Sequence, residues 1–250
     1  MLSEGENAVR GDLEESNQTS KEAQDWPLYN ARDHDQKVRF YPEVLITIVQ
    51  EFCTGFLQTT SRLFWTLAQV NRETLTNWIK NQSPFDWKNV CEWIGGIEAT
   101  QETAQQMENN TRQKMRAVLN VDVHKQPVIR SVHYKVNESI QIPTEFDVVI
   151  TIFCLEYASE TLEEYRRAVR NATTLIKSGG FLVQGGGFKS FGVLEANEYG
   201  FSGRRFKSCF IRKENVLEAL KESGLETTEG TGGFHFITHD EIFLLISKKL

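Results

Sequence analysis

The sequence predicts an α/β fold, and three neighbouring patterns support this prediction. Residues 146–155 form a nearly continuous apolar run rich in valine and isoleucine. Such a run is typical of a strand that is buried on both faces in a parallel sheet. Residues 161–176 carry apolar side chains at helical spacing. The Gly179-Gly180 pair is expected to close this helix in a left-handed turn, before a second buried strand at residues 181–183.

Weaker patterns place further elements around this β-α-β unit. Residue patterns predict helices at residues 72–81 and 214–223, and a polar helix at residues 102–119. Apolar runs predict strands at residues 118–123 and 241–250. Gly224 is expected to end the last helix. The secondary structure of three segments is ambiguous. Residues 44–49 and residues 63–70 are compatible with a strand or a helix. Residues 128–136 are compatible with a loop or an edge strand.

Composition limits the function classes. The chain has 250 residues, a net charge of -6 and 25% charged residues, so a nucleic-acid partner is not expected. The four cysteines lie far apart, which predicts reduced thiols and no metal site. The polar N-terminus has no apolar stretch of the secretory kind. The apolar stretch at residues 44–70 is interrupted by Glu51 and Arg62, so no membrane span is expected. We therefore expect a cytoplasmic monomer.

Low hydrophobicity and mixed charge predict that residues 1–25 are disordered. Residues 26–250 are expected to form a single domain. Residues 26–41 mix aromatic and charged side chains, and we expect them to fold as a short lid on this domain.

Several local sequences resemble the small-molecule amine N-methyltransferase family, which includes nicotinamide, phenylethanolamine and thioether methyltransferases. The matching segments are VLNVDV at 118–123, FDVVITIFCLEYA at 146–158, EEYRRAVRNATTLIKSGGFLV at 163–183 and EIFLLISKK at 241–249. Upstream, YNARDH at 29–34 and NRETLTNWIKNQSPFDW at 71–87 also resemble the family. The combination is more specific than one β-α-β unit, which many folds share.

The resemblance implies a Rossmann-like class I methyltransferase sheet, mostly parallel with an antiparallel last strand. It implies S-adenosyl-L-methionine as the cofactor, bound at the carboxyl ends of the strands. The implied reaction moves a methyl group to the nitrogen of a small-molecule amine. Such a displacement needs alignment, a neutral amine and exclusion of water, so we expect a cofactor cradle and an aromatic pocket instead of a catalytic triad.

The resemblance also implies which residues bind the cofactor. Asp122 matches the family aspartate that accepts from the adenine amino group, and the next backbone N–H, of Val123, contacts the ring. Without the resemblance, a turn-forming aspartate fits the sequence equally well. Asn71 matches a residue that contacts the ribose or adenine. It is equally suited to be the N-cap of the helix that it opens.

Four further residues are expected to contact the cofactor. Ile152 and Phe153 match the wall beside the methionine part, where the family often has a hydroxyl. Thr151 lies one residue earlier and is expected on the opposite face. Tyr29 and His34 lie in the segment that resembles the family lid, with histidine where the family has tyrosine. An exposed histidine is also compatible with no role.

The acceptor is expected to contact three other residues. Asp240 matches the position facing the acceptor amine, where a carboxylate attracts a cation and relays its proton, and it is our candidate catalytic residue. A solvated turn acid is the alternative for Asp240. Ser190 and Ser208 match positions that line the acceptor pocket. Gly186 stands where nicotinamide-type members carry aspartate, which argues against nicotinamide as the acceptor.

One departure from the family affects the cofactor site. The glycine-rich turn after the first strand is missing, and Thr66 stands where the next strand should end in an acid that binds the ribose. The spacing is short by about 30 residues, or one strand-helix unit. The sheet is therefore expected to be incomplete at that unit. A methyltransferase-like protein that has lost its activity is the alternative function, and a spliced or misread segment at residues 39–70 is the alternative origin.

Overall fold

The computed structural model describes residues 62–66, 69–83, 87–188, 198–201, 204–239 and 241–250. All of these residues belong to one compact unit, Asp35–Leu250. The predicted disorder at residues 1–25, the predicted lid at residues 26–41 and the ambiguous segment at residues 44–49 lie outside the described ranges.

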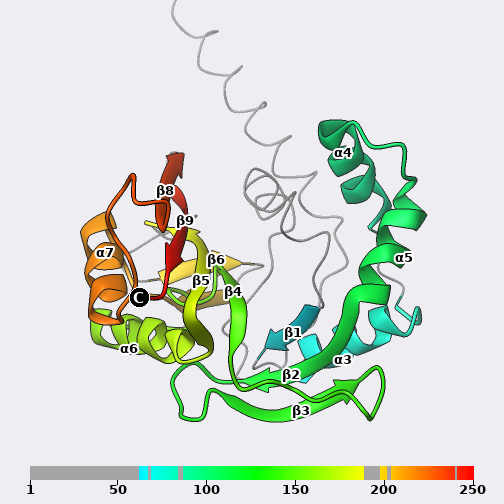
Figure 1. The fold of residues 1–250 in the computed structure, drawn as a ribbon, viewed down its shortest axis with the longest axis horizontal. Helices are drawn as coiled ribbons and strands as arrows, with labels where there is room; N and C mark the ends of the chain where they lie inside the picture. The colour runs from blue at the N-terminus through cyan, green and yellow to red at the C-terminus, as the bar shows by residue number, and fades with distance from the viewer. Residues whose placement is uncertain (1–61, 67–68, 84–86, 189–197, 202–203, 240) are drawn as a thin grey trace, which may run out of the picture. The chain divides into compact units, whose positions relative to one another are not determined.

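Three strands form a first sheet in the order β1-β2-β3, as Figure 1 shows. Their bounds are β1 (Arg62–Thr66), β2 (Met115–Val121) and β3 (Ile129–Lys135). β1 runs parallel to β2, and β3 runs antiparallel to β2 at the edge. The segment that fitted either a loop or an edge strand is therefore an edge strand.

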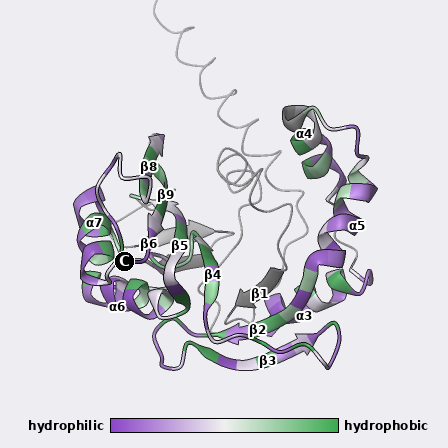
Figure 2. Cartoon of the chain, in the orientation of Figure 1, coloured by the Kyte–Doolittle hydropathy of each residue, from purple (hydrophilic) through white to green (hydrophobic). Residues whose placement is uncertain are grey.

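Three helices connect β1 to β2: α3 (Gln69–Ile79), α4 (Lys88–Glu98) and α5 (Ala104–Lys114). A capping box fixes the start of α5, because Thr103 and Gln106 exchange hydrogen bonds between side chain and backbone. The helix expected at residues 102–119 ends at Lys114, where the fully buried Met115 begins β2. Figure 2 shows that α5 is mainly hydrophilic.

Four strands form a second sheet in the order β4-β5-β9-β8. Their bounds are β4 (Phe146–Ile152), β5 (Ile176–Gly187), β8 (Phe234–His239) and β9 (Ile242–Lys248). β4 and β5 are parallel and are joined by helix α6 (Leu162–Thr173), whereas β9 is antiparallel to both of its neighbours. The predicted β-α-β unit and the antiparallel last strand are confirmed.

The role predicted for Gly179-Gly180 is wrong. Helix α6 ends at Thr173 with a right-handed C-cap at Thr174, so no glycine closes it. Both glycines lie inside β5, where the pairing with β4 shifts register, and Gly179 has a φ of +78°. At Gly180 a Cβ would lie 2.7 Å from the carbonyl oxygen of Asp147. These glycines form an irregular strand start instead of a helix end.

Helices α6 and α7 (Lys213–Glu222) lie side by side against the second sheet (Figure 1). Their apolar faces and the sheet form the main core. Within it, the buried Gln184 side-chain amide donates a 2.9 Å hydrogen bond to the phenol oxygen of Tyr165. Gly224 follows α7 with a φ of +75°, which confirms the glycine expected there. A two-stranded hairpin that was not predicted, β6 (Glu198–Phe201) and β7 (Arg204–Lys207), precedes α7.

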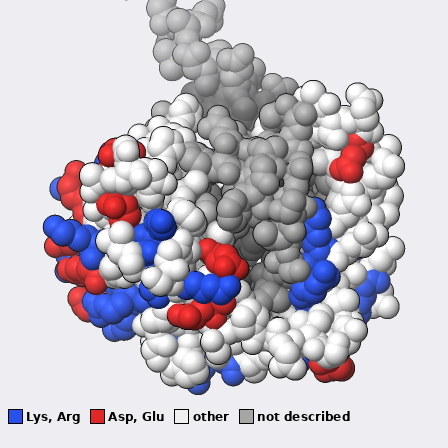
Figure 3. Space-filling model, in the orientation of Figure 1, with Lys and Arg blue, Asp and Glu red and all other residues white. Residues whose placement is uncertain are grey.

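Charges of both signs alternate on the outer surface of α6 and α7, as Figure 3 shows. Arg166 of α6 pairs with Glu218 of α7 at 2.5 Å, which joins the two helices at the surface. None of the described helices combines the length and the hydrophobicity that a membrane-spanning helix needs.

The described strands therefore form two main sheets, with β1 at an edge of one and β4 at an edge of the other. In an uninterrupted sheet, a strand between β1 and β4 would pair with both. Residues 1–61, where a further strand would be sought, lie outside the described ranges, so the incomplete sheet stays a prediction.

Two glycine substitutions test this packing. Gly180→Ala places a methyl group against the backbone of β4, so we expect it to lower the free energy of unfolding by about 1–3 kcal/mol. Gly96→Ala in α4 meets no atom within 4 Å, so we expect it to raise stability by about 0.5–1 kcal/mol. Urea unfolding measures both. Equal effects of the two variants would contradict the register of β4 and β5.

Candidate functional site

The carboxyl ends of β4 and β5 meet at one edge of the second sheet. Ile152 ends β4 and is paired with Gly185, two residues before the end of β5. The N–H of Phe153 donates a 2.8 Å hydrogen bond to the carbonyl oxygen of Gly185, which extends this contact. Ligands of open α/β sheets bind at this edge, outside the carboxyl ends of the strands.

A buried carboxyl group lies at this edge. Glu156, in the loop after β4, is 2% exposed. Its Oε1 accepts a 3.2 Å hydrogen bond from the N–H of Gly187, and its backbone oxygen accepts from the N–H of Cys209. Its Oε2 is buried and has no hydrogen-bond partner among the described residues. Burial raises the pKa of Glu156 to about 8, so at neutral pH the group is largely protonated.

The thiols next to Glu156 stay neutral. Burial, and to a smaller extent the charge of Glu156, raises the pKa of Cys154 to about 12 and that of Cys209 to about 11. Neither thiol therefore supplies a thiolate near neutral pH. Glu156 is the group in this cluster that changes its charge in the neutral range.

Two pairs of aromatic rings lie near the carboxyl ends of β4 and β5. Phe153 and Tyr157 meet edge to face at 6.0 Å, and Ile152 and Ile242 pack against them. Phe188, which follows β5, stacks on Phe243 of β9 at 5.0 Å. Such walls exclude water from the edge of the sheet.

Phe153 has a left-handed backbone with a φ of +47°. This conformation costs energy for a residue with a side chain, and strained residues of this kind cluster at functional sites. Ile152 lies over Gly185, where its Cδ1 would be 3.0 Å from an added Cβ. The predicted positions Ile152 and Phe153 therefore form an apolar wall, and their contact with a cofactor stays a prediction.

Asp122 follows β2 and forms a turn. Its Oδ1 accepts a 3.0 Å hydrogen bond from the N–H of His124, and its Oδ2 lies 3.2 Å from Nζ of Lys125. The side chain is 7% exposed. These bonds show the turn-forming role, and each oxygen retains lone pairs for a further donor. The contact with a purine stays a prediction.

The turn after β2 is bound to the loop that carries Glu156. The backbone oxygen of Val123 accepts a 2.7 Å hydrogen bond from the Asn171 side chain in α6. Nε2 of His124 lies 2.7 Å from the carbonyl oxygen of Ala158, so Nε2 carries the proton in this bond. Asp122 and Glu156 thus stand in two segments that one side-chain hydrogen bond joins.

The structure describes two of the other predicted site residues, Asn71 and Ser208, and does not describe the remaining four. Asn71 is the third residue of α3, so the N-cap role that was open to it is excluded. Ser208 is buried directly before Cys209, whose N–H contacts Glu156. The remaining positions, Tyr29, His34, Ser190 and Asp240, lie outside the described residues. The N–H of Phe188 donates to the carbonyl oxygen of Glu241, the residue that follows Asp240.

Sequence reasoning missed Glu156. The signal was present, because Glu156 is the one ionisable acid in the apolar segment FCLEYA. A charged residue inside a buried segment is rare and needs a partner or a function. The apolar pattern of this segment predicts the strand and not the role of the group that follows it.

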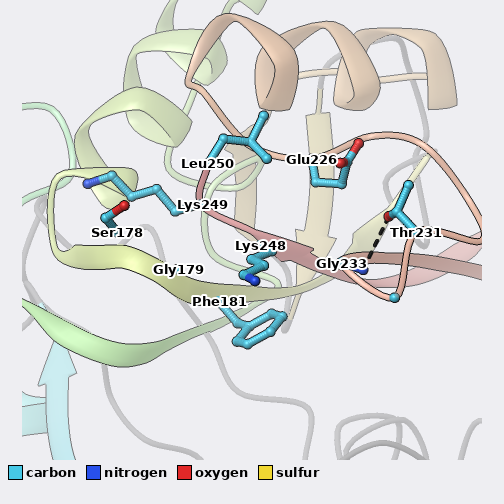
Figure 4. Close-up of a pocket in the computed structure, with 10 residues that line it drawn as sticks. Ser178, Gly179, Phe181, Glu226, Thr231, Gly233, Lys248, Lys249 and Leu250 are labelled. Carbon is cyan, nitrogen blue, oxygen red and sulfur yellow. Dashed lines mark hydrogen bonds between the residues drawn. The ribbon is translucent and has the colours of Figure 1, made fainter.

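A separate cavity of about 460 Å³ lies elsewhere on the second sheet. Figure 4 shows Phe181, Glu226 and Lys248 around it. It adjoins the start of β5 and the end of β9, whereas Glu156 contacts the end of β5. This cavity is therefore not part of the candidate site. Among the described residues, no three His, Cys, Asp or Glu side chains are grouped to hold a metal ion.

Comparisons with known proteins agree with the sequence motifs. Nicotinamide N-methyltransferase of Caenorhabditis elegans is 53% identical over 183 residues, which are 73% of this chain and 64% of that protein. Phenylethanolamine N-methyltransferase of Sus scrofa is 31% identical over 163 residues, which are 64% of this chain and 53% of that protein. The chain therefore spans between about half and two thirds of the length of these relatives.

Among solved structures, the N-methyltransferase NodS from Bradyrhizobium japonicum WM9, in complex with S-adenosyl-L-homocysteine, has a TM-score of 0.33. The identity is 14%, and the match covers 60% of this chain and 63% of that chain. The model of the NNMT/PNMT/TEMT family matches residues 60–250. The resemblance inferred from the motifs is confirmed, and the chain belongs to the NNMT/PNMT/TEMT family.

Proposed function

We propose that this chain is an S-adenosyl-L-methionine-dependent N-methyltransferase that acts on a small-molecule amine. The buried carboxyl group of Glu156 is the observation that supports the proposal most strongly. It lies at the edge of the sheet where ligands bind, and its Oε2 is buried without a hydrogen-bond partner in the described part of the chain. A buried polar atom of this kind calls for a partner, and an amine N–H supplies one.

The chemistry requires a neutral amine, since only the lone pair of nitrogen attacks the methyl carbon. Most aliphatic amines arrive as ammonium ions. In the proposed mechanism the Glu156 carboxylate accepts one proton from the ammonium nitrogen and thereby frees its lone pair. When bound, S-adenosyl-L-methionine supplies an electrophilic methyl group on a sulfonium. The rings of Phe153 and Tyr157 keep water away from the reacting nitrogen.

The residues that the resemblance identified are proposed to hold the cofactor. Asp122 and Val123 would hold the purine, and Ile152 and Phe153 would line the methionine part. The residues present fit such a group, because an acidic side chain and an apolar wall lie in segments joined through His124. Asn71, Tyr29 and His34 complete the proposed cofactor set.

The residues that contact the acceptor amine are proposed from the same family resemblance. Ser208, Ser190 and Asp240 would line the acceptor pocket, with Asp240 as a second carboxylate and candidate catalytic residue. The names of the relatives support a small nitrogen-containing acceptor. We further propose that the protein works as a monomer in the cytoplasm, without nucleic-acid partners.

Binding of S-adenosyl-L-homocysteine tests the cofactor site. Calorimetric titration is expected to show binding, and Asp122→Asn is expected to weaken it about 10-fold, because a hydrogen bond to a charged group is worth about 1.5 kcal/mol more. The asparagine retains an oxygen for the N–H of His124, so the turn is preserved. Glu138→Gln removes an exposed acid and serves as the control. Absence of heat at millimolar ligand would refute cofactor binding by this chain.

Glu156→Gln tests the proton acceptor. With phenylethanolamine as the acceptor, we expect kcat/KM of the unchanged chain to rise with pH until about 8, where Glu156 loses its proton. Glu156→Gln is expected to abolish this rise and to lower kcat/KM by about 100-fold. Initial rates with labelled cofactor measure both effects. A variant that keeps the rising limb would rule Glu156 out.

The pH dependence of stability tests the buried carboxyl group without any substrate. The pKa of Glu156 is about 8 in the folded chain, against an ordinary value of 4.5. The folded state therefore keeps a proton that the unfolded chain loses, so this contribution to stability is complete below the ordinary pKa. It falls by up to about 1.4 kcal/mol per pH unit until the folded pKa is reached. Urea unfolding should show this decline, and Glu156→Gln should remove it.

A further inference from the structure

One buried amide side chain binds the segment between β2 and β3 to helix α6. Asn171 lies in the last turn of α6 and is buried. Its Nδ2 donates a 2.7 Å hydrogen bond to the carbonyl oxygen of Val123. Its Oδ1 accepts a 2.8 Å hydrogen bond from Nε2 of Gln126. Both polar atoms of this amide therefore have partners, and both partners belong to the segment that follows β2.

Helix formation does not explain an asparagine at position 171. Asparagine is one of the weaker helix formers, and burial of an amide is unfavourable unless it is hydrogen-bonded. Most other buried side chains of α6 are apolar, among them Ala168, Val169 and Ala172. A carbonyl oxygen such as that of Val123 only accepts, so the side chain that reaches it from α6 has to supply a donor. The NH2 group of Asn171 supplies this donor.

The bond from Asn171 fixes one side of the peptide group between Val123 and His124. A trans peptide group is planar, with its C=O and its N–H on opposite sides. The C=O of this group accepts from Asn171, and its N–H donates a 3.0 Å hydrogen bond to Oδ1 of Asp122. A rotation of the plane would move both bonds at once. The amide of Asn171 therefore sets the direction from which the N–H meets the Asp122 carboxylate.

The other bonds of Asp122 leave its carboxylate less restrained. The N–H of Asp122 donates to the carbonyl oxygen of Val128, and its own carbonyl oxygen accepts from the N–H of Lys125, so both bonds hold the main chain. Oδ2 pairs with Nζ of Lys125, whose side chain is largely exposed, and such ion pairs contribute little. Nε2 of His124 lies 2.7 Å from the carbonyl oxygen of Ala158, a bond that holds the imidazole ring and not the N–H of His124.

We propose that Asn171 is a positioning residue for the cofactor. It holds the peptide group between Val123 and His124, and this group orients the carboxylate of Asp122. The carboxylate is the group proposed to accept from the purine amino group, so Asn171 controls cofactor affinity from inside α6. This inference rests on the proposed function and adds to it a residue that acts through Asp122.

A role in holding the purine has a kinetic signature. The ribose separates the purine of S-adenosyl-L-methionine from the methyl group that is transferred. A contact to the purine is therefore expected to be equally strong before and during the methyl transfer. Loss of such a contact raises KM for the cofactor and leaves kcat unchanged.

The first experiment measures binding of S-adenosyl-L-homocysteine to the full chain by calorimetry. Asn171→Leu keeps a similar volume but has no donor, and it is expected to weaken binding about 10-fold. Gln126→Ala is the matched control, because it also loses a bond to Asn171 but leaves the bond to Val123 intact. It is expected to weaken binding less than about 2-fold. With labelled S-adenosyl-L-methionine and phenylethanolamine, Asn171→Leu should raise KM for the cofactor about 10-fold and change kcat less than about 2-fold.

A double-mutant cycle separates positioning from general loosening of the fold. In an Asp122→Ala chain no carboxylate is left to orient, so Asn171→Leu should weaken binding less than about 2-fold further. A purely structural role would give the same loss with and without Asp122. If Asn171→Leu does not fold, Asn171→Ala takes its place in every measurement.

A second experiment needs no ligand and follows amide hydrogen exchange by NMR. The N–H of His124 should exchange at least about 10-fold faster in Asn171→Leu than in the unchanged chain or in Gln126→Ala. The N–H of Asp122, bonded to Val128, is the internal reference. Unchanged exchange at His124, or an equal loss of affinity in the Asp122→Ala chain, would overturn the proposal. An unchanged chain that binds no S-adenosyl-L-homocysteine refutes the proposed function, and the exchange at His124 then judges Asn171 by itself.

Discussion

The parallel pairing of β4 with β5 determines where the other parts of the candidate site lie. Because α6 carries the chain back across the sheet, both strands end at the same edge. The N–H of Gly187 can therefore reach the loop after β4, where it binds Glu156. The rings of Phe188 and Phe243 close the same edge from the antiparallel side. A buried carboxyl group is tolerated there because it binds one backbone donor and its pKa is raised toward the neutral form.

Much of the fold was predictable from the sequence, since hydrophobic patterns report burial directly. The strand at β4, the helix α6, the last strand β9 and the glycine after α7 all follow from local periodicity. Gly179 and Gly180 were misread because a glycine pair serves a helix end and an irregular strand equally well. Glu156 could not be found from periodicity alone. Its importance comes from contacts between segments that are about 30 residues apart in the chain.

The structure brings some of the predicted site residues together and leaves others apart or undescribed. Asp122 and the loop of Glu156 are joined through His124 and Ala158, so two ends of the proposed pocket are held together. The described strands nevertheless leave β1 and β4 at the edges of separate sheets. Family membership rests on residues 60–250, and the chain spans between about half and two thirds of the length of its relatives.

A crystal structure of the chain with S-adenosyl-L-homocysteine and phenylethanolamine tests the central claim most directly. We expect a purine at Asp122 and the amine nitrogen within hydrogen-bond distance of Oε2 of Glu156. An amine bound away from Glu156, or a purine that does not contact the turn after β2, would contradict it.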